Sequence, residues 1–191
     1  MDYKMKKYIR RTNDGWMTVI MDGKREPVPE YLKVDLIENK GGRDHFTILE
    51  GVYKGKAASL AQGNLRSGSV HTNAVHLTFD LRKAELSYNS VKIHAFTDNA
   101  NPIKKGEHPI QIPDFPHEGG KYYLDKSAYA LNWFYLGVGH AVKGKNDRYL
   151  HPGAGSAGCI TVDPDEWTKL YQYIILSRSG DGKNVGKVTV K

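Results

Sequence analysis

The most regular alternation of apolar and polar residues lies in the middle of the chain. Residues 75–81 alternate with a period of two, and residues 91–95 repeat this pattern after a turn at Asn89-Ser90. This period is typical of strands with one buried face. We therefore expect a hairpin-like, half-buried sheet between residues 75 and 95.

Three later segments extend this sheet. Residues 108–115, HPIQIPDF, predict a strand that Pro113 stops. Residues 129–142, YALNWFYLGVGHAV, are apolar enough for a central strand or for a pair of strands with a glycine bend. Residues 186–190, GKVTV, predict a closing strand.

One helix is well marked. Asp163 is the predicted N-cap, Pro164 suits the first helical position, and Glu166 completes a capping-box pattern. The helix should end near Gly180. Its apolar face has helical spacing and consists of Trp167, Leu170, Tyr171, Ile174 and Ile175.

The first third of the chain has weaker patterns. Residues 16–24 and 45–55 predict strands, the first of which runs into an Asp22-Gly23 turn, and residues 29–42 predict a short helix closed by two glycines. Residues 55–73 are rich in Gly, Ser and Asn and predict a long loop or linker. We therefore expect a β-rich extension or small subdomain at 1–73, of unknown function, and a main domain at 74–191. The predicted fold class is mainly β, a β-rich α+β fold with one principal helix.

Charge changes this picture little. The chain carries 28 Lys and Arg against 21 Asp and Glu, a net charge of +7 that favours contact with polyanions. Five of the positive residues lie in the first eleven, and the others are scattered, so we expect no specific nucleic-acid partner. No run of eighteen apolar residues predicts a membrane span, and no apolar signal-peptide core is visible.

The candidate chemistry centres on the single cysteine, Cys159, in the stretch LHPGAGSAGCITV. A nucleophilic cysteine needs a nearby base and donors for an oxyanion. His151 ends a predicted short strand, and Cys159 precedes the helix cap. Between them, Gly153, Gly155 and Gly158 allow the backbone to approach a substrate. One cysteine with scattered histidines lacks ligand-pair spacing, so we expect no metal and no cofactor. A papain-type order is also unlike this one, because here the histidine precedes the cysteine.

This order resembles the catalytic domain of L,D-transpeptidases, which cross-link peptidoglycan stem peptides. Residues 150–153 are similar to the family's hydrophobic-His-x-Gly strand end, and residues 156–160 are similar to its Ser-x-Gly-Cys-aliphatic motif. The likeness extends over residues 74–191, including NPIKKGEHPIQI at 101–112, the opening hairpin, the helix and the closing strand. It implies an L,D-transpeptidase-like β-sandwich with the helix after the catalytic cysteine.

The resemblance implies that Cys159 is the nucleophile and His151 the base. It also implies oxyanion donors near Gly158 and Cys159, a loop-holding or substrate-contacting Ser156, and substrate contacts from Tyr149, Trp133 and Gly153. The expected partners are peptidoglycan stem peptides, with a monomeric protein in the bacterial periplasm or cell wall, or secreted. The alternatives are an L,D-carboxypeptidase or D-amino-acid exchange enzyme, including a secreted antibacterial effector with an immunity protein, and a non-catalytic wall- or polyanion-binding module.

Four features depart from the family pattern. The segment between His151 and Cys159 is short, Pro152 follows the histidine, Ala157 stands where many members have a second histidine, and the Arg or Asn that often follows the cysteine motif is replaced by Thr161 and Val162. His140 is an alternative base, because its separation from Cys159 is nearer the family's usual one. The register of the two segments favours His151. We interpret His94, His108 and His117 as surface or turn residues, and residues 112–123 as a loop that borders the site.

Overall fold

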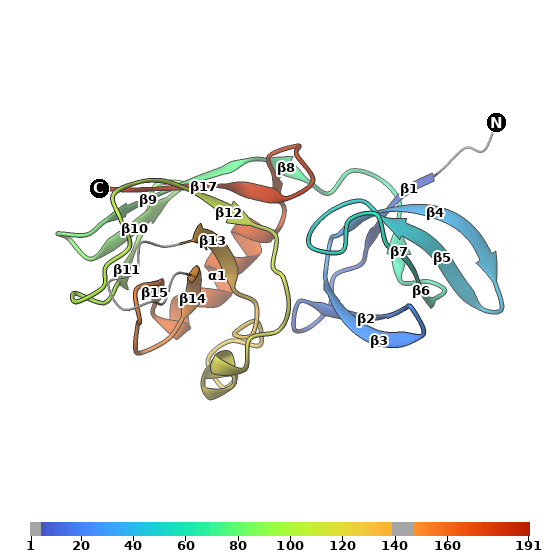
Figure 1. Ribbon diagram of the computed structural model, residues 1–191, viewed down its shortest axis with the longest axis horizontal. Helices are drawn as coiled ribbons and strands as arrows, with labels where there is room; N and C mark the ends of the chain where they lie inside the picture. Colours follow the sequence, from blue (N-terminus) through green and yellow to red (C-terminus); the bar gives the residue numbers. More distant parts are fainter. Residues whose placement is uncertain (1–4, 139–146) are drawn as a thin grey trace.

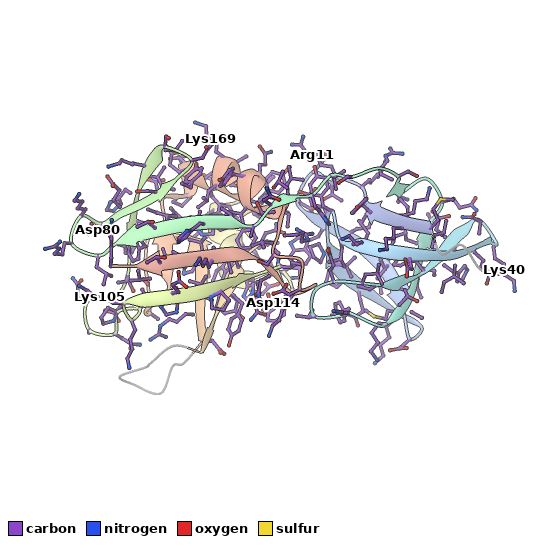
Figure 2. All side chains as sticks on the ribbon, turned by 90° about the horizontal axis from the view of Figure 1, so that it is seen from above. Arg11, Lys40, Asp80, Lys105, Asp114 and Lys169 are labelled. Atoms are coloured by element: carbon purple, nitrogen blue, oxygen red, sulfur yellow. The ribbon has the colours of Figure 1, made fainter. Side chains whose placement is uncertain are left out.

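The computed structural model describes residues 5–138 and 147–191. It forms two lobes along its longest axis (Figure 1). Lys40 and Asp80 lie toward opposite ends of the molecule, and Arg11 and Asp114 lie near the junction (Figure 2). The fold is mainly β with a single α-helix in the described chain, which confirms the predicted class.

The first lobe is one seven-stranded sheet in the order β3-β2-β6-β5-β4-β1-β7. The sheet bends around its own apolar core (Figure 1), in which Val19, Phe46 and Ile48 are fully buried. Its strands are β1 (Met5–Ile9), β2 (Trp16–Met21), β3 (Lys24–Pro29), β4 (Lys33–Lys40), β5 (Arg43–Ile48), β6 (Ala57–Ala61) and β7 (Leu65–Arg66).

Two expectations for this lobe are wrong. The predicted helix at 29–42 is instead β4, which pairs with β1 and β5, and Gly41-Gly42 forms a hairpin turn at positive φ instead of a helix cap. The predicted loop at 55–73 contains β6, β7 and the two-residue β8 (Thr72–Asn73). In the sheet, β6 lies between β2 and β5. The predicted turn at Asp22-Gly23 is confirmed: it joins β2 to β3, with both residues at positive φ.

The second lobe is an eight-stranded sheet in the order β12-β17-β9-β10-β11-β15-β14-β13. Its strands are β9 (Val75–Asp80), β10 (Glu85–Tyr88), β11 (Val91–Phe96), β12 (Gly106–Gln111), β13 (Phe134–Val138), β14 (Asp147–Pro152), β15 (Ile160–Val162) and β17 (Asn184–Val190). The predicted strands at 75–81, 91–95 and 186–190 are confirmed. The strand predicted at 108–115 is also present, but it ends at Gln111, two residues before Pro113. An additional strand, β10, separates the first two. The segment predicted as a central strand contributes β13, which stands last in the order.

The single α-helix, α1 (Pro164–Ile175), follows β15 directly and lies across the sheet (Figure 1). All five residues of the predicted apolar face are buried. The Asp163 side chain caps the helix by accepting from the N–H of Asp165 at 2.9 Å, and Glu166 makes no reciprocal capping-box bond. The helix ends at Ile175, five residues before Gly180, because the chain turns there into β16 (Ser177–Arg178), which pairs with β8.

Buried polar contacts join the two lobes. The Arg178 guanidinium donates to Glu50 at 2.9 Å, and the Tyr171 hydroxyl on α1 donates to Glu30 at 3.2 Å. The side-chain amide of Asn132 donates to the Asp14 carbonyl at 2.7 Å. Asn132 immediately precedes Trp133, so the first lobe contacts the segment that carries one wall of the candidate site.

Candidate functional site

The predicted histidine and cysteine lie on or beside two paired strands. β14 and β15 run parallel, with Leu150 beside Ile160 and His151 beside Thr161. Leu150 and Ile160 are fully buried on the core face. Because side chains alternate along a strand, His151 and Thr161 share the other face. Cys159 stands one position before β15, beside Tyr149.

The imidazole of His151 is fixed on both sides. Its Nδ1 lies 2.9 Å from the Pro152 carbonyl, which can only accept, so Nδ1 carries the proton and Nε2 is the acceptor. Its ring stacks on Trp133 with the centroids 4.3 Å apart. The carbonyl after the histidine therefore orients the imidazole even though that residue is a proline. The acceptor Nε2 lies 3.2 Å from the Thr161 hydroxyl oxygen.

Burial keeps His151 neutral. The side chain is 7% exposed, and loss of hydration lowers its pKa to about 4, against the opposing hydrogen bond to Pro152. The positive charge that His117 can carry acts in the same direction as burial. At neutral pH this imidazole is therefore in the form that accepts a proton.

Cys159 is partly buried, and its sulfur accepts a hydrogen bond from the backbone and not from His151. The N–H of Tyr149 donates to the sulfur at 3.3 Å. Burial raises the pKa of the thiol, while the Tyr149 N–H and the positive charge of Arg148 lower it. Among the described residues no hydrogen bond joins the thiol to the imidazole. The resting site therefore holds a neutral thiol and a neutral imidazole with separate partners: for the two groups to meet, the sulfur must leave the Tyr149 N–H and Nε2 must leave the Thr161 hydroxyl.

The loop between His151 and Cys159 is tied to itself. The Ser156 hydroxyl donates to the Cys159 carbonyl at 2.9 Å and accepts from the N–H of Gly158 at 3.2 Å. Ser156 thus holds the loop. The N–H of Gly158 is engaged in this bond, so its predicted oxyanion role would require the bond to open. Gly153 pairs with Val162 through its N–H at 3.0 Å and lies beside Thr161.

An aromatic cluster forms the wall beside His151. The rings of Phe115, His117, Trp133 and His151 stack in succession, with centroid distances of 4.5, 4.5 and 4.3 Å. The edge of the Tyr149 ring meets the His117 ring at 4.6 Å. Two of the residues predicted to contact substrate, Trp133 and Tyr149, therefore lie together in this wall.

Sequence reasoning missed the place of His117. We interpreted it as a surface or turn residue, but its side chain is only 11% exposed and donates from Nε2 to Asp114 at 2.8 Å. Asp114 also accepts from the Tyr149 hydroxyl at 3.0 Å, and burial raises the pKa of Tyr149. The segment that carries Asp114 and His117 borders the site, as residues 112–123 were expected to do. His140, the alternative base, lies outside the described residues.

No protein-family model, curated protein or solved structure matches this chain. Within residues 5–138 and 147–191, no group of three or more His, Cys, Asp or Glu side chains could hold a metal ion. No helix in the same ranges is long and apolar enough to cross a membrane. The groups of this site that can take part in chemistry are a thiol, an oriented neutral imidazole and the backbone N–H groups near Cys159, of which the Gly158 N–H is bonded to Ser156.

Proposed function

We propose that the protein is an L,D-transpeptidase-like cysteine acyltransferase that acts on peptidoglycan stem peptides. One observation carries this proposal most directly: a neutral imidazole, oriented by a main-chain carbonyl, lies on β14, and Cys159 immediately precedes the neighbouring strand β15. A nucleophile, a base and a group that orients the base form the minimal arrangement for acyl transfer. The order of the motif residues resembles that family, and the substrate class rests on this resemblance.

In the proposed reaction, the Cys159 side chain leaves the Tyr149 N–H and turns toward His151, while the Thr161 hydroxyl leaves Nε2 and donates to the Gly155 carbonyl, 3.4 Å away. Nε2 of His151 accepts the thiol proton, and the thiolate attacks the carbonyl carbon of the L-centre in a stem tetrapeptide. The negative charge on the carbonyl oxygen is stabilised by backbone N–H groups at the start of β15. Loss of one such donor typically costs about 2.7–4 kcal/mol of barrier height.

The intermediate then collapses. The imidazolium of His151 returns its proton to the nitrogen of the leaving D-alanine, the C–N bond breaks, and a thioester remains on Cys159. The amine of a second stem peptide, after losing its proton to His151, attacks the thioester and forms the cross-link; the C–S bond breaks, and the Cys159 thiolate takes the proton back from His151. When water attacks instead, the product is a shortened tripeptide, and when a free D-amino acid attacks, that residue is exchanged.

The short loop leaves the choice of acceptor open to experiment. Only seven residues separate His151 from Cys159, and Ala154 within them is anchored by its N–H to the Tyr123 hydroxyl at 2.9 Å. A short, anchored loop offers little surface for a second peptide strand, and this favours hydrolysis or exchange as the second candidate activity. In either case the proposed place of action is the bacterial periplasm or cell wall, including delivery as a secreted effector.

Incubation with disaccharide tetrapeptides followed by mass spectrometry tests the proposal. Dimers indicate transpeptidation, tripeptides indicate hydrolysis, and the loss of both products in Cys159→Ala ties the activity to the thiol. If the folded protein yields neither product, the proposal is wrong and a non-catalytic binding module becomes the better reading.

The base is assigned by covalent labelling with a carbapenem, which acylates a reactive thiol. Labelling should be lost in His151→Ala and kept in His140→Ala. His94→Ala is the matched control, because the His94 side chain is exposed on β11 and its ring stacks on Phe96 and not on a residue of the candidate site. Loss of labelling in His140→Ala with retention in His151→Ala would reverse the assignment.

A further inference from the structure

An arginine is buried directly beneath the nucleophile loop. Arg148 precedes Tyr149 on β14, and its side chain is among the largest of the fully buried ones, at 1% exposure. One terminal nitrogen of the guanidinium, Nη2, donates to the Asn101 side-chain oxygen at 3.0 Å. The other, Nη1, donates to the Asp147 carbonyl at 3.3 Å. Within residues 5–138 and 147–191, these two acceptors hold the guanidinium in one orientation.

Asn101 connects this arginine to the loop. It lies in the segment between β11 and β12 and is 4% exposed. While its side-chain oxygen accepts from Arg148, its side-chain nitrogen donates to the Ala157 carbonyl at 3.2 Å. A single amide therefore bridges the guanidinium and the residue two positions before Cys159.

Gly158 packs on the same pair of residues. Its φ is +116°, and a Cβ at this position would lie 2.5 Å from the Asn101 carbonyl oxygen and 2.7 Å from the guanidinium carbon of Arg148. Such distances are well inside van der Waals contact, so only glycine permits this approach. The backbone that leads into Cys159 rests on the guanidinium itself.

The charge of Arg148 also reaches the thiol. It is one of the two influences that lower the pKa of Cys159 against the raising effect of burial. The other is the N–H of Tyr149, the residue next to Arg148 on the strand. In a poorly hydrated site a fixed positive charge interacts strongly with a forming negative charge.

We propose that Arg148 and Asn101 are positioning residues that hold the backbone of Ala157, Gly158 and Cys159 in the conformation that presents the thiol and its neighbouring N–H groups. In this arrangement the positive charge of the site comes from Arg148 on β14, the strand before the loop. The residues after the cysteine motif, Thr161 and Val162, carry no charge. This role for Arg148 and Asn101 deepens the proposed function and rests on that function for the identity of the substrate. The expected effect on the reactivity of the thiol is independent of the proposed function.

Two reagents separate the charge from the geometry. Iodoacetamide alkylates a thiolate by displacement at a saturated carbon, so its rate follows the thiolate fraction and the access to sulfur. 4-Nitrophenyl acetate acylates the thiol through a tetrahedral oxyanion and releases 4-nitrophenolate, so its rate also depends on the N–H donors. Because Cys159 is the only cysteine in the chain, the alkylated thiol is identified without ambiguity, and acylation is counted as the part of the signal that Cys159→Ala abolishes.

Arg148→Met removes the charge and keeps an apolar side chain of similar length. We expect alkylation at pH 7.5 to fall about tenfold, with the rate recovering at high pH, because an adjacent opposite charge typically shifts a pKa by about one unit or more. Arg148→Lys keeps the charge but loses the planar fork. It should leave alkylation within about twofold and reduce ester acylation by roughly tenfold or more, since a small displacement of reacting groups has effects of this size.

Asn101→Ala tests the bridge alone and should behave as Arg148→Lys does. The control is Arg82→Met, which removes an exposed arginine of the same lobe and should change neither rate. Thermal unfolding identifies the variants that fold, and Arg148→Lys and Asn101→Ala carry the test if Arg148→Met does not fold.

Unchanged rates with both reagents in folded Arg148→Met and Asn101→Ala would overturn the inference. Equal losses with both reagents in Arg148→Lys and Asn101→Ala would also overturn it, because they would indicate lost access to sulfur instead of misplaced donors. A wild-type protein that reacts with both reagents and leaves stem peptides intact would contradict the proposed function without touching this inference.

Discussion

The buried, neutral imidazole of His151 makes the stability of the protein depend on pH in a defined window. Its pKa is about 4 in the folded state, chiefly because of burial, and about 6.5 in an unfolded chain. Between these values the unfolded state binds more protons than the folded state. The stabilisation is therefore fully present above about pH 6.5 and is lost as the pH falls toward 4.

The size of the effect follows from the two pKa values. At pH 5 the linkage relation gives a loss of about 2 kcal/mol for one such histidine, relative to pH 7.5. A typical domain has a total stability of about 5–15 kcal/mol, so the change is readily measured. His71, which lies at the junction of the lobes, also has its pKa lowered to about 4, by burial and by the charge of Arg178, and acts in the same direction. Burial raises the pKa of Glu30, which acts in the opposite direction.

Comparison with a variant isolates His151 from these other groups. Urea unfolding of the wild-type protein and of His151→Asn at pH 7.5 and pH 5.0 gives four free energies of unfolding. The free energy of unfolding of the wild type minus that of His151→Asn should be about 2 kcal/mol smaller at pH 5.0 than at pH 7.5. His94→Asn, which alters an exposed ring, should leave the pH dependence of the wild type unchanged.

An equal difference at both pH values would refute the reasoning, because it would mean that the folded and unfolded states of His151 titrate alike. A second readout is catalytic. Since His151, the proposed base, stays neutral until the pH approaches 4, acylation of Cys159 should keep its acid limb below the pH range of an exposed histidine, and an acid limb near pH 6.5 would contradict the assigned environment.

Three further changes have outcomes that the structure specifies. Arg178→Met leaves Glu50 buried without the partner that lies 2.9 Å away and should lower the free energy of unfolding by about 3–5 kcal/mol, whereas a double variant that also replaces Glu50 with Leu should recover much of this loss in urea unfolding. Gly158→Ala places a methyl group 2.5 Å from a backbone oxygen of the neighbouring loop and should reduce ester acylation of the thiol by at least about tenfold; a rate near that of the wild type would show that the loop can shift freely. Trp133→Leu removes the ring stacked on His151 and should lower the rate of acylation of Cys159. A variant whose melting temperature falls while its acylation rate stays that of the wild type would contradict this role.

The parts of the fold that the sequence predicts correctly are those with local causes. The cap at Asp163 and the apolar face of α1 lie within thirteen consecutive residues, so the pattern alone specifies them. The alternation in residues 75–81 likewise specifies β9. The segment at 29–42 was wrong because a short amphipathic stretch before two glycines fits both a helix and a hairpin strand, and pairing with β1 and β5 decided between them.

The site depends mostly on contacts that no local pattern encodes. The sequence indicated the thiol, the imidazole and the loop between them, because these lie within nine residues. It gave no indication that Arg148 lies beneath Gly158, since an arginine beside a predicted strand end has the same pattern as a solvated surface residue. His117 was misjudged for a related reason: its burial comes from Trp133 and Asp114, which its immediate neighbours do not reveal.

The parallel pairing of β14 with β15 has a consequence for how this site tolerates change. The pairing places His151 beside Thr161, and a shift of one residue would turn the thiol to the core face and Ile160 toward the imidazole. A change that alters which residue of β15 faces His151 would therefore disrupt the candidate site even if His151 and Cys159 were both retained. The register of these two short strands therefore determines which side chains of the candidate site face each other.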